Sequence, residues 1–205
     1  MQDKYNSYPE ITFLKWFKTI DKAFQNYGTR EYNKITHTKM SVLKDALHKY
    51  SYIHFIDADV VILKEPTLEY WNKYSDYDIV FQDDAPTPGV NVPFSLWSCT
   101  GNFTLRNSER TINFLNSIEE WQEKHPENND QECMYNMLRQ KYNDLRDVKE
   151  VKLYQYPMCE FMCGYIITHN LMNTEKTYFF HANHVQGNLA KINLLNRVNK
   201  WYLKN

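Results

Sequence analysis

Apolar residues recur at helical spacing in two stretches near the start of the chain. In each stretch their positions fall on one face of a helix. The first helix is expected to end near Gly28, and both helices precede the first strand pattern. The apolar positions are Ile11, Leu14, Phe17 and Phe24 in the first stretch and Met40, Leu43, Leu47 and Tyr50 in the second.

Strand patterns begin at residues 52–56, a short apolar run rich in strand-forming residues that ends abruptly at Asp57-Ala58-Asp59. Apolar residues resume over 60–63. The other expected strands are 78–81, 103–106, 151–154 and 178–180, and helices are expected after Ser108, from Asp130 and over 189–202. Because strands and helices alternate, we expect one α/β domain over residues 1–205, with a mixed, mainly parallel sheet flanked by helices.

The composition supports one packed core and excludes several classes of partner. The chain has 205 residues, of which 42% are hydrophobic, and a formal net charge of -1 with Lys and Arg scattered along it. No basic stripe is present to hold nucleic acid. No apolar run could span a membrane, and the N-terminus has no hydrophobic signal region. The four cysteines lack CxxC pairing, which favours a reducing compartment, so we expect a cytoplasmic protein.

Asp57 and Asp59 carry the first indication of chemistry. Alternation in an extended segment points both carboxylates the same way, just past the carboxyl end of a buried strand. Two neighbouring negative charges are costly unless a cation or hydrogen bonds compensate them, and ligand clefts in α/β sheets lie at this position. A hard divalent cation completed by substrate phosphates fits these ligands. The alternative is a turn stabilised by the aspartates themselves.

Four segments place these aspartates in a wider pattern. They are YIHFIDADVVILKEP at 52–66, CTGNFTLR at 99–106, NDQE at 129–132 and FHANHVQG at 180–187, which Lys191 follows. In this order they resemble the DxD segment, the glycine-containing strand, the DQ segment and the closing H-x-N-x-x-x-G-x-x-x-K segment of GT-A glycosyltransferases. The resemblance is to the nucleotide-diphospho-sugar transferase group that includes glycosyltransferase family 77, and it extends from about Lys39 onward.

The resemblance implies a metal site. Asp57 and Asp59 would hold Mn²⁺ or Mg²⁺, with a histidine as a further ligand. In related retaining enzymes this histidine lies three residues before the closing glycine, which is His184 here, whereas the family pattern has its histidine at the position of His181. Both remain candidate ligands, with a slight preference for His184.

The resemblance also implies substrate contacts. Asp130 and Gln131 would lie on the sugar side of the cleft as candidate catalytic residues, although Asp130 could instead cap its helix. Lys191 would neutralise the leaving diphosphate, and backbone amides at Gly187 would approach a phosphate. The alternatives are that Lys191 is a solvated helix lysine and that Gly187 serves only a turn. The residues expected to contact the nucleotide sugar are Lys39, Asp57, Ala58, Asp59, Gly187 and Lys191.

Further residues allow two interpretations. The aromatic rings of Trp97, Tyr156 and Phe161 could form an acceptor platform or belong to the core. Asp83 and Asp84 could contact the acceptor, although a polar turn explains them better.

The sequence therefore predicts a metal-dependent glycosyltransferase. It would transfer a sugar from a nucleoside-diphosphate donor, with uridine the expected base, to a glycan or other hydroxyl acceptor with retention of configuration. GT-A domains usually open with a base-binding strand, and no strand pattern precedes the first helix. One alternative is therefore a non-catalytic nucleotide-sugar or glycan-binding module. Another is a haloacid-dehalogenase-like phosphatase. That family has its DxD motif near the chain start and a Thr after it, whereas here the motif follows two expected helices and precedes Val60, so this alternative is disfavoured.

Overall fold

A computed structural model of the chain describes residues 25–84, 95–169 and 175–200. The first expected helix, with Ile11, Leu14 and Phe17, lies outside the described residues, as does any strand before it. The second expected helix is α2, Arg30–Lys49, which buries Met40 and Leu43. Among the described residues, no helix is both long and apolar enough to cross a membrane.

A four-stranded sheet forms the centre of the fold, with the order β1-β4-β3-β5. Its strands are β1 (Tyr52–Ile56), β3 (Ile79–Asp83), β4 (Ser98–Arg106) and β5 (Leu153–Tyr156). β4 is antiparallel to both neighbours, and Ile56 at the end of β1 is opposite Asn102. β4 therefore continues beyond the end of β1, alongside the aspartates that follow.

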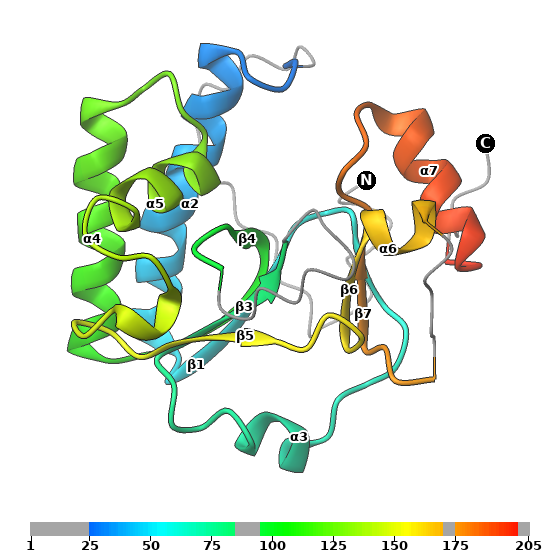
Figure 1. Ribbon diagram of the computed structural model, residues 1–205, viewed down its shortest axis with the longest axis horizontal. Coiled ribbons are helices and arrows are strands. Elements are labelled where there is room, and N and C mark those ends of the chain that lie inside the picture. Colours follow the sequence, from blue (N-terminus) through cyan, green and yellow to red (C-terminus); the bar gives the residue numbers. More distant parts are fainter. Residues whose placement is uncertain (1–24, 85–94, 170–174, 201–205) are drawn as a thin grey trace.

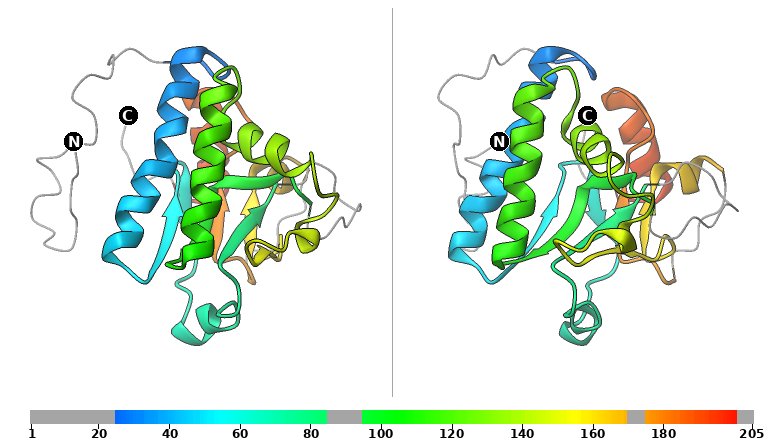
Figure 2. Two further views of the ribbon diagram at one scale, coloured as in Figure 1. Left: turned by 90° about the vertical axis from the view of Figure 1, so that its left-hand side faces the viewer. Right: turned by 60° about the vertical axis from the view of Figure 1, so that its left-hand side comes forward.

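Three helices cover one face of this sheet. Besides α2 they are α4 (Glu109–Lys124) and α5 (Asp130–Leu138), and both views in Figure 2 show α2 and α4 side by side against the strands. The apolar residues that alternate along the strands, such as Phe81 and Leu105, meet residues such as Leu47 of α2 and Leu115 of α4 in one core. This packing fixes α2 and α5 along the edge of the later site.

A three-stranded sheet lies beside the first, with the order β2-β7-β6 (Figure 1). Its strands are β2 (Val60–Ile62), β6 (Phe161–Cys163) and β7 (Phe179–His181), and α6 (Gly164–Thr168) and α7 (Asn188–Arg197) pack on it. A second core between the sheets joins Val80 to Phe161 and Phe179, and Tyr70 of α3 (Leu68–Asn72) closes it.

The expected fold class, a mixed α/β domain with sheets flanked by helices, is confirmed, but the expectation of a mainly parallel arrangement is wrong. Among the described residues, three of the five strand pairings are antiparallel. The pair β3 and β5 is parallel because α4 and α5 separate those strands in the chain, as a crossover requires. β3 and β4 have no such helix among the described residues and pair antiparallel.

Several elements differ from the sequence expectation. β4 starts at Ser98 rather than at residue 103. The apolar pattern did not indicate the first half of this strand because that half is mostly polar, although it is buried in the structure. The Asn102 side chain donates to Gln82 and accepts from His54, so it satisfies its own polar atoms inside the protein. β6 and the short helices α3 and α6 were not expected, and Cys163 lies in the buried strand β6.

Candidate active site

The segment Asp57-Ala58-Asp59 is the turn that connects the two sheets. The Val60 amide donates to the Asp57 carbonyl across this turn, 3.0 Å away. The Asp57 amide donates to the Gly101 carbonyl of β4 at 2.7 Å, and the Asp59 carbonyl accepts from the Ala182 amide, beyond β7, at 3.0 Å. The main chain therefore fixes the first aspartate to one sheet and the second to the other.

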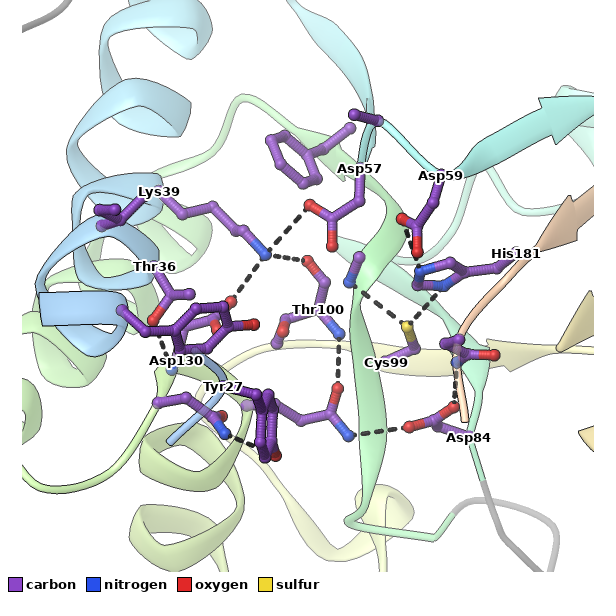
Figure 3. A pocket seen from close by; sticks show the side chains of 18 of the residues that line it. Tyr27, Thr36, Lys39, Asp57, Asp59, Asp84, Cys99, Thr100, Asp130 and His181 are labelled. Atoms are coloured by element: carbon purple, nitrogen blue, oxygen red, sulfur yellow. Dashed lines mark hydrogen bonds and ion pairs between the residues drawn. The ribbon is translucent and has the colours of Figure 1, made fainter. Parts of the chain in front are cut away.

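His181, the last residue of β7, joins these two carboxylates. One possible ligand atom from each of Asp57, Asp59 and His181 lies within 4.8 Å of the other two, and Nε2 of His181 is 3.3 Å from Oδ1 of Asp59. The side chains are 39%, 15% and 6% exposed, respectively, so the group opens to solvent on the side of Asp57. Figure 3 shows the three side chains converging.

Gly101 leaves the space that this group needs. A Cβ atom at this position would lie 2.5 Å from Oδ2 of Asp57 and 2.5 Å from Cε1 of His181, closer than real contacts allow. Two carboxylates and an imidazole around a space kept clear of side chains fit a divalent cation of the Mn²⁺ or Mg²⁺ type.

Two lysines neutralise the aspartates. Nζ of Lys39 lies 3.5 Å from Asp57 and 2.7 Å from Asp130, and it donates to the Thr100 carbonyl at 2.7 Å. Burial alone would lower the pKa of Lys39, but Asp130 and Asp57 outweigh it and raise that pKa. The second lysine is Lys191 of α7, which contacts the carboxylate of Asp59. Each of the two aspartates is thus paired with one lysine.

The carboxylate of Asp59 is held in its charged form. Burial would raise its pKa, but the hydrogen bond from His181 and the hydrogen bond and charge of Lys191 lower it below the usual range. Asp59 thus remains a carboxylate at neutral pH, which is the form that binds a cation.

Asp130 and Gln131 open α5 on the opposite side of the site. Asn129, not Asp130, is the N-cap, and its side chain accepts from the Glu132 amide in a capping box. The carboxylate of Asp130 is therefore free to pair with Lys39. Gln131 donates to Asp84 at 2.9 Å and accepts from the Thr100 amide at 3.3 Å, so it spans from β4 to the end of β3.

His184 lies apart from the metal-type group. Its Nε2 is 3.0 Å from Asp84, which also accepts from Asn183 at 2.6 Å. The hydrogen bond with Asp84 and a second with Cys163 raise the pKa of His184 to about 10, so its imidazole is charged at neutral pH. His184 has a φ of 58°, a conformation unusual for a residue with a side chain. The geometry therefore favours His181 over His184 as the metal ligand.

These residues line one cavity of about 820 Å³. It contains almost all of the site residues expected from sequence, namely Lys39, Asp57, Ala58, Asp59, Asp130, Gln131, His181, His184 and Lys191. Gly187 is not in its lining but precedes α7 with a φ of 82°. Trp97 lines the cavity. Tyr156 and Phe161 instead stack on each other in the core between the sheets, with ring centroids 3.8 Å apart, so these two residues cannot form an acceptor platform.

Sequence reasoning missed several residues of the cavity. Cys99 lies behind His181, and Asn183 bridges Asp84 and the Gly164 amide. Asp84 was expected in a polar turn, yet it is buried and accepts from side chains of two separate segments. Its only signal in sequence was its position after the apolar strand 78–81.

The Asp-Asp-His group lies in a cavity of the mixed α/β fold and forms a candidate cation site, and comparison with known families gives its class. The chain belongs to the nucleotide-diphospho-sugar transferase family, whose model matches residues 5–195, and it is a glycosyltransferase. This assignment rests on nearly the full length of the chain. The closer relationship to glycosyltransferase family 77 stays a prediction.

Other comparisons add less. Among solved structures, the chain is similar to a glycosyltransferase involved in the glycosylation of the major capsid of PBCV-1. The two share 11% identity with a TM-score of 0.49, over 86% of this chain and 80% of that one. No curated protein gives a significant match.

Proposed function

We propose that the protein transfers a sugar from a nucleoside-diphosphate donor, with uridine the expected base, to a hydroxyl of a glycan or other acceptor, in a reaction that depends on Mn²⁺ or Mg²⁺. The observation that carries this proposal is the convergence of Asp57, Asp59 and His181 on one side of an 820 Å³ cavity. Retention of the anomeric configuration is the expectation from the family resemblance.

Asp57, Asp59 and His181 would hold the cation. When bound, it supplies Lewis-acid stabilisation of the diphosphate and orients the two phosphates. Asp59 is charged and partly enclosed, which suits it to bind the cation. Asp57 is more exposed and faces the open side, where the donor would enter.

Lys191 would contact the diphosphate. Its amine already lies against Asp59 while its side chain remains 36% exposed, so it can reach an anion in the cavity without crossing a packed region. A positive charge there stabilises the negative charge that develops as the sugar bond breaks. Gly187 supports the same role. It precedes α7, and no side chain caps the start of this helix, so the backbone amides of the first turn of α7 can donate to a phosphate.

Lys39 would act from the other side. It is buried and held by Asp57, Asp130 and the Thr100 carbonyl, so it fixes the first aspartate relative to α5. Gln131 follows on the wall of the cavity. We place the donor sugar against Asp130 and Gln131. The nucleotide would lie beside Ala58, in the turn that carries the two aspartates.

The test is an assay of purified protein with a panel of nucleoside-diphosphate sugars in Mn²⁺, in Mg²⁺ and in EDTA. We expect metal-dependent release of the nucleoside diphosphate from one donor, abolished by EDTA and restored by added Mn²⁺. Proton NMR of the released or transferred sugar would show the anomer of the donor if configuration is retained. Turnover that is unchanged in EDTA would contradict metal dependence.

Calorimetry combined with this assay separates the enzyme from a binding module. Calorimetry that shows donor binding with Mn²⁺, but no turnover with water or any acceptor, would favour a non-catalytic protein. Release of inorganic phosphate from simple phosphate esters would favour the phosphatase alternative, which family membership already disfavours.

A further inference from the structure

The two ring nitrogens of His181 have different partners. Nε2 lies 3.3 Å from Oδ1 of Asp59, and Nδ1 lies 3.4 Å from Sγ of Cys99. The ring is almost fully buried, at the end of β7. A half-turn of the ring would place carbon atoms against both partners, so the contact with Cys99 helps to set which nitrogen faces the aspartates.

Cys99 is itself held in place. It lies in β4, is buried, and its Sγ accepts from the Gly101 amide at 3.3 Å. Gly101 is the residue whose missing side chain leaves room for Asp57 and His181. The thiol therefore lies at a fixed point behind the imidazole, with the His181 ring between it and Asp59, as Figure 3 shows.

A thiol suits this position because it can donate or accept a hydrogen bond. Without a metal, the proton on Nε2 can be donated to Asp59, and Nδ1 then accepts from the Cys99 thiol. With a metal on Nε2, the ring proton must lie on Nδ1. The sulfur then accepts a hydrogen bond from this N–H group. A carbonyl or carboxylate would serve only the second arrangement, because neither can donate.

We propose that Cys99 is a positioning residue for the metal ligand His181, holding the ring in the same orientation in both tautomers. The inference rests on the proposed metal site, and Cys99 would act on the metal only through the ring of His181. Partners of this kind behind a ligating histidine typically change metal affinity about 10- to 100-fold.

The test is Mn²⁺ affinity measured without nucleotide sugar, from the electron paramagnetic resonance signal of free Mn²⁺. We expect Cys99→Ala to weaken binding about tenfold, at the low end because a thiol is a weak hydrogen-bonding group. Cys99→Ser, whose hydroxyl also donates and accepts, should recover most of the loss. Cys133→Ala is the matched control, because that buried cysteine lies outside the cavity, and it should bind like the wild type.

Nitrogen-15 NMR of the His181 ring gives a second readout that does not depend on metal. Wild type should show one dominant tautomer, and Cys99→Ala a mixture. Wild-type affinity and an unchanged tautomer in both Cys99→Ala and Cys99→Ser would overturn the role of Cys99, provided Asp59→Ala loses binding. If the wild type itself binds no Mn²⁺ with or without uridine diphosphate, the metal site fails, and this inference fails with it.

Discussion

Asp59→Ala is expected to lower kcat/KM for sugar transfer about 10³-fold, because several kcal/mol of charge stabilisation disappear with the metal. Asp59 contacts His181 and Lys191 at once, so its removal affects the proposed histidine ligand and the lysine proposed to bind the diphosphate together. The measurement is the steady-state rate of nucleoside-diphosphate release at saturating Mn²⁺, together with Mn²⁺ affinity.

Two controls separate the charge from the fold. Asp59→Asn keeps the shape and should lose nearly as much activity, because the neutral amide oxygen lacks the negative charge with which the carboxylate binds a divalent cation. Asp76→Ala removes a carboxylate from an exposed position outside the cavity and should retain wild-type activity. An Asp59→Ala enzyme that keeps its rate would refute the metal role of this residue.

Gly101→Ala is expected to reduce kcat/KM about 10²-fold, because displacements of about 1 Å at a reacting centre have effects of this size. The added methyl group would meet Asp57 and His181 at 2.5 Å, so both must move away from the cation position. Mn²⁺ affinity should fall in parallel. The measurement is turnover and Mn²⁺ binding on the same protein preparation.

Stability provides the control for Gly101→Ala. Alanine fits strand backbone, so thermal unfolding should show a folded protein with a cooperative transition. The account would be wrong about Gly101 if the variant bound Mn²⁺ and turned over donor as the wild type does. A variant that fails to fold would instead show that the strand cannot shift, and Gly101→Ser would then be no better, since it carries the same Cβ.

The longer helices of the described residues and the strand before the aspartates could be predicted because their signals are local. The run 52–56 became β1, and Ser108 caps α4 as its position suggested. The site was harder to predict, since it depends on contacts between distant segments. Asp57 and Asp59 were found because they lie together in sequence, whereas Asp84 and Cys99 give no local signal of their partners.

The histidine ligand illustrates the limit most clearly. The sequence offered His181, from the family pattern, and His184, from its spacing to the closing glycine, with a slight preference for the second. The structure shows that β7 pairs with β2, opposing His181 to Val60, the residue just after Asp59. That register brings His181 to the aspartates, and three residues later the chain has already turned towards Asp84. Strand register is a long-range property that no local spacing reveals.

The most direct test of the metal site is a crystal structure of the protein with Mn²⁺ and uridine diphosphate, with anomalous data collected to locate manganese. We expect one manganese peak bonded to carboxylate oxygens of Asp57 and Asp59 and to Nε2 of His181, with phosphate oxygens completing the coordination. A peak bonded to His184 in place of His181, or no manganese at the two aspartates, would contradict the proposed metal site.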